Sequence, residues 1–434
     1  MNPYYQDDSV TLHHGDALDI LTELPDASVD AVVTDPPYGL ANTTPEQVAD
    51  TLVRWINGER DYVPSGAGFM GKRWDAFVPP VAVWDECLRV LKPGGHLLAF
   101  SGSRTFDLMA IGVRMAGFDI RDGIAWLYGS GFPKSLDVSK AIDKAAGAER
   151  EVTGVGTPFG SGSLRNRSRV EQGYRPTELN PSGGAAKITA PATPDAARWQ
   201  GWGTALKPAF EPIVVARKPL AGTVAANVLA HGTGALNIDG CRVAGEKPAT
   251  TRGASVKASS MAAPLGGQGR IEDDGKGRWP TNVVLDDTQA AELDRQSGTL
   301  TSGSRRAGDY GLMGYMGADA APMPAIEGDA GGASRFFPTF RYEAKAPTSE
   351  RPRAGEVAHP TVKPLDLMRW LVRLVTPPGG TVLEPFAGSG TTAEACVIEG
   401  FQCIAIEREA DYLPLIVGRL TKPIQVGLDF GGVA

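Results

Sequence analysis

The chain is poor in residues that bind metals or form disulfides: 434 residues include only four cysteines and five histidines. The cysteines (Cys87, Cys241, Cys396 and Cys403) have neither metal-ligand spacing nor a disulfide pattern, so we expect reduced thiols, a cytoplasmic location and no bound metal. No apolar stretch is long enough to span a membrane, and the N-terminal MNPYYQDDSV lacks the features of a signal peptide.

Positive charge is also scarce overall, because the formal net charge is −7. It is nevertheless concentrated in two stretches, with ten Lys/Arg against five Asp/Glu from Arg150 to Lys218 and eight against four from Arg335 to Arg373. Since the distribution of charge matters more than its sum, a nucleic-acid surface remains compatible with this composition. Solvated loops with some arginines explain it equally well.

The two ends of the chain alternate between strand and helix patterns. The predicted strands are Ser9–His14, Val29–Thr34, His96–Ser101, Ile120–Tyr128, Glu211–Ala216, Thr381–Glu384 and Cys403–Glu407. Helical spacing of apolar residues covers Leu18–Leu24, Val81–Leu91, Phe106–Ala116, Lys363–Val375, Gly390–Glu399 and Asp411–Leu420. This alternation predicts an α/β fold with a mostly parallel sheet and helices on both faces. The middle of the chain is rich in Gly, Ala and Pro and predicts an irregular surface.

A glycine-containing turn follows the strand in TVLEPFAGSGTT at 381–392. Gly388 and Gly390 let the backbone approach a ligand, and the next helix begins with free N–H groups that suit a carboxylate. Glu407, roughly twenty residues later, ends the following strand, where an acid binds ribose hydroxyls in nucleotide-type folds. Asp16 also ends a short strand, and it either accepts a bond from an adenine amino group, caps a helix, or does both.

A second motif, Asp35-Pro36-Pro37-Tyr38, follows a buried strand. The prolines stiffen the loop and remove two backbone donors. Asp35 and the Pro36 carbonyl can accept both N–H bonds of an exocyclic amino group, and Tyr38 offers a face on which a base can stack. A plain rigid turn is the alternative for this tetrapeptide taken alone. Together the two motifs indicate methyl transfer from S-adenosylmethionine to a nucleobase amino nitrogen, on a base flipped out of its duplex.

Three motifs resemble those of the DNA amino-methyltransferases that make N6-methyladenine or N4-methylcytosine: DPPY at 35–38, HPTVKP at 359–364 and FAGSG at 386–390. Their order is that of the permuted beta class, which implies the seven-stranded, mostly parallel methyltransferase sheet with one antiparallel strand in EPIVVARKP. The resemblance implies catalytic roles for Asp35, Pro36, Pro37 and Tyr38. It implies cofactor binding by Asp16, His359, Thr361, Lys363, Glu384, Phe386, Ala387, Gly388, Gly390, Thr391 and Glu407.

The resemblance also divides the chain. Residues 1–133 are expected to form the catalytic half of the core, 206–218 a core strand, and 351–434 the cofactor-binding half. The segment 134–205 is a long insertion that could contact DNA, and 219–350 is the expected target-recognition region. Glu384 stands where the family commonly has Asp, which preserves the acid. Trp126 would either line the base pocket or belong to the core.

The function expected from these motifs is site-specific methylation of adenine N6 in double-stranded DNA. The aspartate of DPPY favours adenine over cytosine N4, which is the nearest alternative. Methylation of RNA or of a protein amide, and DNA binding without catalysis, are more distant alternatives. S-adenosylmethionine is the expected cofactor. The expected partners are DNA and a cognate restriction endonuclease, and the protein is expected to be a monomer or a homodimer.

Overall fold

The computed structural model describes residues 2–66, 68, 73–129, 135–155, 187–244, 277–301, 330–340, 353–354, 357–359 and 361–422. The chain divides into two compact units, which we call the large unit (Met1–Gly129 with Ala209–Ala434) and the small unit (Ser130–Pro208). Much of the expected target-recognition region, 219–350, lies outside the described residues, as does the middle of the insertion at 134–205.

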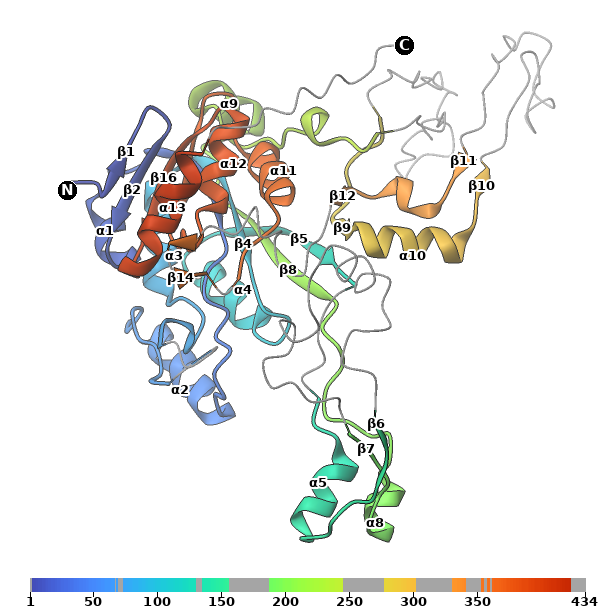
Figure 1. Ribbon diagram of the computed structural model, residues 1–434. Helices are drawn as coiled ribbons and strands as arrows, with labels where there is room; N and C mark the ends of the chain where they lie inside the picture. Colours follow the sequence, from blue (N-terminus) through green and yellow to red (C-terminus); the bar gives the residue numbers. More distant parts are fainter. Residues whose placement is uncertain are drawn as a thin grey trace, which may run out of the picture. The chain divides into compact units, whose positions relative to one another are not determined.

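A single ten-stranded sheet forms the centre of the large unit, in the order β1-β2-β16-β15-β3-β4-β8-β5-β9-β12 (Figure 1). The strands are β1 (Tyr5–Gln6), β2 (Val10–His14), β16 (Gln402–Glu407), β15 (Thr381–Glu384), β3 (Val29–Thr34), β4 (Leu91–Phe100), β8 (Phe210–Arg217), β5 (Asp119–Leu127), β9 (Val283–Asp286) and β12 (Thr339–Phe340). Neighbours are parallel except that β1 is antiparallel to β2 and β8 is antiparallel to both β4 and β5. The mostly parallel α/β sheet with one antiparallel core strand is therefore confirmed. The seven strands expected from the sequence form the run from β2 to β5, and β1, β9 and β12 extend it.

Strands from opposite ends of the sequence are neighbours in this sheet. Val382 and Leu383 of β15 pair with Ala31 and Val32 of β3. On its other side, β16 pairs in parallel with β2, with Glu407 opposite His14. Because the carboxyl ends of parallel strands lie at one edge of a sheet, the loops after β2, β3, β15 and β16 all meet at that edge.

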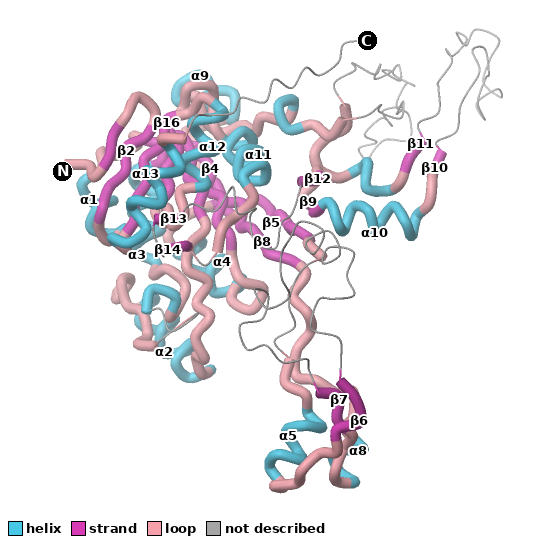
Figure 2. Tube along the Cα trace, viewed as in Figure 1, coloured by secondary structure: helices cyan, strands magenta, loops and turns pink. Residues whose placement is uncertain are grey.

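Helices cover both faces of the sheet. Alternate residues of each strand point to opposite sides, so the buried strands present apolar side chains to both faces. On β4, Leu98 and Phe100 belong to one buried apolar cluster and Leu97 and Ala99 to the other. The first cluster includes residues of α11 (Leu365–Val375), α12 (Thr391–Glu399) and α13 (Leu413–Leu420). The second includes residues of α1 (Ala17–Glu23), α3 (Val81–Val90) and α4 (Phe106–Met115). Figure 2 shows these helices in cyan beside the magenta strands.

Further helices of the large unit are α2 (Pro45–Ile56), α9 (Val224–His231) and α10 (Asp287–Ser297). The start of α2 is strongly specified locally, because Thr44 and Gln47 form a reciprocal capping box and Pro45 occupies the first turn. In the described part of the chain, no helix combines the length and the apolar character needed to cross a membrane.

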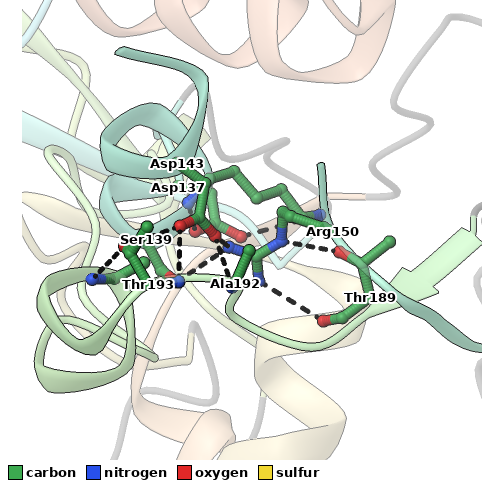
Figure 3. A network of polar contacts seen from close by, with 9 residues as sticks. Asp137, Ser139, Asp143, Arg150, Thr189, Ala192 and Thr193 are labelled. Atoms are coloured by element: carbon green, nitrogen blue, oxygen red, sulfur yellow. Dashed lines mark hydrogen bonds and ion pairs between the residues drawn. The ribbon is translucent and has the colours of Figure 1, made fainter. Parts of the chain in front are cut away.

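The small unit contains α5 (Val138–Ala145), α8 (Pro194–Arg198) and the antiparallel pair β6 (Val152–Val155) and β7 (Lys187–Thr189). Its centre is polar (Figure 3). The fully buried Asp143 pairs with Arg150 at 2.5 Å and accepts hydrogen bonds from Thr193 N and Oγ1 at 3.0 and 2.7 Å. Arg150 in turn donates to Ser139 Oγ and Thr189 Oγ1. A buried ion pair whose oxygens also receive other donors holds these elements together without a large apolar core.

Candidate active site

The Asp35–Tyr38 loop, which we call the transfer loop, follows β3 and meets a buried lysine. Lys363 Nζ donates to Asp35 Oδ2 at 2.6 Å and lies 3.4 Å from Glu211 Oε2. The hydroxyl of Tyr38 donates to the same Glu211 oxygen at 2.9 Å. Two carboxylates, one ammonium group and one phenol thus form a closed polar cluster at the carboxyl edge of the sheet.

The charges in this cluster fix its protonation. Burial disfavours the ammonium form of Lys363, but Asp35 and Glu211 outweigh burial and raise the lysine pKa, so that it stays charged. Burial and the same two carboxylates raise the pKa of Tyr38 well above its usual value, so the phenol remains a donor. Lys363 Nζ also lies 5.2 Å from the centroid of the Tyr38 ring and 4.9 Å from that of Phe100, within cation–π range.

The backbone of the transfer loop is held from two sides. Asp75 is buried, and its Oδ1 accepts hydrogen bonds from the backbone N–H groups of Tyr38 and Gly39 at 2.9 and 3.0 Å. Thr105 Oγ1 donates to the carbonyl of Tyr38 at 2.6 Å. Since the two prolines already restrict φ, these contacts leave the loop little freedom.

Glu384, at the end of β15, joins the transfer loop to the glycine-containing turn. It is buried and accepts hydrogen bonds from Thr34 Oγ1, from Thr392 Oγ1 at 2.5 Å and from Phe386 N at 3.0 Å. Burial raises its pKa to about 8, although these donors act in the opposite direction. Thr34 directly precedes Asp35, so this carboxyl links the ends of β3 and β15 and the first turn of α12.

The turn after β15 needs glycine at two positions. Gly388 and Gly390 have φ values of +53° and +76°, which disfavour any residue with a Cβ. A Cβ on Gly390 would lie 2.9 Å from Ile416 Cγ2, and one on Gly388 would lie 3.1 Å from Nε2 of His359. The His359 ring packs edge-on against Tyr412, with centroids 4.6 Å apart. The HPTVKP segment and the glycine turn are therefore in direct contact.

Two acids lie next to this turn. Glu407, at the end of β16, accepts hydrogen bonds from Gly388 N and Glu409 N, both at 2.7 Å. Burial raises its pKa to about 7 in spite of these bonds. Asp16 Oδ1 accepts from Leu18 N at 3.0 Å and caps α1, while Oδ2 lies 3.6 Å from Arg408 Nη1. The capping role expected for Asp16 is thus present, and its contact with an adenine stays a prediction.

Residues 192–418, just over half of the chain, match the sequence model of the N6_N4_Mtase family, described as DNA methylase. The chain belongs to this DNA methylase family. The match confirms the family predicted from the three motifs.

Two related methyltransferases match shorter segments of this member of the DNA methylase family. The type II methyltransferase M.BamHI of Bacillus amyloliquefaciens is 32% identical over 101 residues, which are 23% of this chain and 19% of the relative. M.ScaI of Streptomyces caespitosus is 35% identical over 89 residues, which are 20% of this chain and 28% of the relative. The matched segments therefore span less than a third of these relatives. Among solved structures, PvuII DNA methyltransferase (cytosine-N4-specific) has a TM-score of 0.42 at 14% identity, covering 96% of this chain and 88% of the other.

The residues predicted for the site lie on elements that meet at one edge of the sheet. Glu384, Phe386, Ala387, Gly388, Gly390 and Thr391 form the turn between β15 and α12, and Ala387 N bonds to Ile406 O at 2.8 Å. His359 and Thr361 contact each other beside that turn, through His359 Nδ1 and the backbone of Thr361. Lys363, which is predicted to bind the cofactor, contacts Asp35 of the transfer loop, and its cofactor role stays a prediction.

Sequence reasoning missed three residues that hold the transfer loop: Glu211, Asp75 and Thr105. The position of Glu211 could have been predicted. It lies near the start of the antiparallel strand β8, and such a strand begins at the edge where its parallel neighbours end, which is the edge of the site. Asp75 ends the short 3-10 helix Arg73–Asp75 and Thr105 directly precedes α4, and neither position has a distinctive sequence pattern. Trp126 is buried in the apolar cluster, which agrees with the prediction that it belongs to the core. Among the described residues, no three His, Cys, Asp or Glu side chains form a group able to hold a metal.

Proposed function

We propose that this member of the DNA methylase family transfers a methyl group from S-adenosylmethionine to the N6 amino group of adenine in double-stranded DNA. The observation that carries the proposal is the hydrogen bond between Thr34 and Glu384, which joins the first residue before Asp35-Pro36-Pro37-Tyr38 to the start of the glycine turn. A base held at the transfer loop and a ligand held at the glycine turn would then be neighbours.

The residues at the glycine turn fit S-adenosylmethionine. Gly388 and Gly390 allow the turn to adopt positive φ values, and the first N–H groups of the helix α12 that follows suit a carboxylate. Glu407 ends β16 with a carboxyl that can accept bonds from ribose hydroxyls once it is ionised. When bound, the cofactor supplies an electrophilic methyl group.

The residues at the transfer loop fit an exocyclic amino group. Asp35 and the carbonyl of Pro36 would accept its two N–H bonds, which favours a tetrahedral nitrogen with a localised lone pair. Lys363 holds the Asp35 carboxylate in place before the base arrives. An acceptor that is already oriented costs no reorganisation as positive charge develops on the nitrogen. We assign adenine as the target because the loop begins with Asp, and N4 of cytosine is the alternative target.

Methylation can be tested with the full-length protein in a host that lacks DNA methylation. Long-read sequencing of the host DNA and mass analysis of its nucleosides should reveal N6-methyladenine in one sequence context. Asp35→Ala should abolish this mark while S-adenosylmethionine binding, measured by calorimetry, persists. N4-methylcytosine would replace the adenine assignment, and the absence of any methylated base would refute the proposed activity.

A further inference from the structure

The small unit exposes two adjacent tryptophans. Trp199 and Trp202 are 41% and 60% exposed, and their rings meet edge-to-face with centroids 5.0 Å apart. Tryptophan is normally well buried, and paired exposed aromatic rings are typical of interaction surfaces. Leu136 and Leu206 of the same unit are also exposed, at 58% and 93%.

The backbone that carries these rings is ordered. Trp199 directly follows α8, and Trp202 N donates to the Trp199 carbonyl at 3.1 Å. The carbonyl of Trp202 in turn accepts from Val138 N, in the first turn of α5, at 3.1 Å. Asp137 and Gly203 form an isolated β-bridge beside this contact. The rings are therefore presented on a fixed turn that is anchored to α5.

The charge of the small unit is opposite to that of the whole chain. Ser130–Pro208 contains eleven Lys/Arg and seven Asp/Glu, whereas the chain as a whole has a formal net charge of −7. Lys140 and Lys144 lie one turn apart on the exposed face of α5 and line a hollow of about 520 Å³. A unit whose sequence carries net positive charge and whose surface exposes aromatic rings is complementary to nucleic acid, which offers phosphates and base faces.

The connections of the small unit lead to the transfer site. The chain leaves the large unit after Gly129 and returns at Ala209, two residues before Glu211. Glu211 contacts both Tyr38 and Lys363. Tyr128 N donates to the Ala209 carbonyl at 2.9 Å and holds the two connections together. The tether of the small unit thus starts at the edge where a target base would bind.

We propose that the small unit is a DNA-contacting element separate from the region 219–350, with Trp199 and Trp202 packing against the DNA and Lys140 and Lys144 facing phosphates. This inference rests on the proposed DNA methylation. It assigns a role to an insertion that the family motifs do not cover.

The test compares full-length wild-type protein with the Trp199→Ala/Trp202→Ala variant. The probe is a short fluorescein-labelled duplex that contains the methylated sequence context, and anisotropy gives its affinity. The loss of two stacking rings should weaken duplex binding about tenfold or more, while the affinity for S-adenosylmethionine stays unchanged. The Trp199→Phe/Trp202→Phe variant should restore duplex binding, whereas Trp199→Leu/Trp202→Leu should not. Ile56→Ala, at a 71% exposed position on α2, should behave as wild type.

Unchanged duplex affinity in the Ala variant would overturn the inference. The inference would also be overturned if the wild type sediments as a dimer, the Ala variant sediments as a monomer, and both bind the duplex equally. The tryptophan face would then contact a second copy of the chain. If the Ala variant melts at a lower temperature, Lys140→Glu/Lys144→Glu replaces it and should weaken binding and reduce its salt dependence. A wild-type protein that methylates no DNA would reject the proposed function, whereas a methylating wild type with an unaffected Ala variant rejects only the role of the small unit.

Discussion

Lys363 Nζ lies 2.6 Å from Asp35 Oδ2, although 328 positions separate the two residues in the sequence. The contact joins the HPTVKP segment to the transfer loop, and Glu211 completes it from the antiparallel strand β8. The lysine is therefore placed to orient the acid that we propose receives the target amino group.

The role of Lys363 can be separated from cofactor binding. Lys363→Met should reduce the single-turnover methylation rate about 100-fold, because Asp35 loses the cation that orients it, while affinity for S-adenosylmethionine changes little. The two carboxylates left behind should also destabilise the fold by about 3 kcal/mol. Adding Glu211→Gln should recover part of that stability without recovering the rate. A large loss of cofactor affinity would instead support the role predicted from the sequence.

Cofactor affinity should depend on the ionisation of Glu407. Burial raises its pKa to about 7, so lowering the pH below that value protonates the carboxyl and removes an acceptor for ribose hydroxyls. The dissociation constant for S-adenosylmethionine should therefore rise as the pH falls from 8 to 6, as measured by calorimetry. Glu407→Gln should bind more weakly at pH 8 and lose this component of the pH dependence. An identical pH profile in the variant would count against the assignment.

Stability should also respond to the buried Glu384. Its pKa in the folded protein is about 8, above the ordinary value of 4.5, so the folded state binds more protons between these limits. The stabilisation is complete below about pH 4.5 and is lost as the pH rises through 8. Glu384→Gln should reduce this loss by about 1–3 kcal/mol between pH 5 and pH 8.5 in urea titrations. A variant whose stability declines with pH as steeply as that of wild type would contradict this explanation.

The glycine turn offers a matched pair of substitutions. Gly390 and Gly400 both have φ of +76°, but a Cβ on Gly390 would lie 2.9 Å from Ile416, whereas one on Gly400 meets nothing within 4 Å. Gly400→Ala should cost about 1 kcal/mol of unfolding free energy from backbone strain alone. Gly390→Ala should cost about 2 kcal/mol more because the packing against α13 must also shift. Equal costs would show that the contact with Ile416 is easily relieved.

The buried strands could be predicted closely from the sequence. Val29–Thr34 and Thr381–Glu384 match β3 and β15 residue for residue, because strands buried on both faces read as continuous apolar runs that end in polar loops. The helix α2 was missed even though Thr44, Pro45 and Gln47 form a complete start signal. The added strands β9 and β12 are short and lie in the Gly-, Ala- and Pro-rich middle of the chain, where no alternation of strand and helix patterns marks them.

The contacts around the transfer loop were less predictable. The motifs identify Asp35 and Tyr38, since their chemistry is local to the loop. The hydrogen bonds from the loop to Asp75 and Thr105 depend on how distant loops pack, which no local pattern records. The HPTVKP segment predicts that Lys363 binds the cofactor, and the structure places its ammonium group against Asp35 after β3 and Glu211 of β8. The contact of Lys363 with these two carboxylates depends on the tertiary fold, so it could not be predicted from the spacing of the motifs.

The bond between Thr34 and Glu384, with 350 positions between its partners, has a consequence for biosynthesis. During synthesis, β3 is made long before β15, which is its second neighbour in the sheet. Until β15 has been made, one edge of β3 stays unpaired and can bind a chaperone or another chain. A translation product interrupted anywhere between the two strands would carry the acidic loop but no glycine bend. Such a fragment would lack the turn that we propose binds S-adenosylmethionine, so premature termination should produce a protein without the proposed methylation activity.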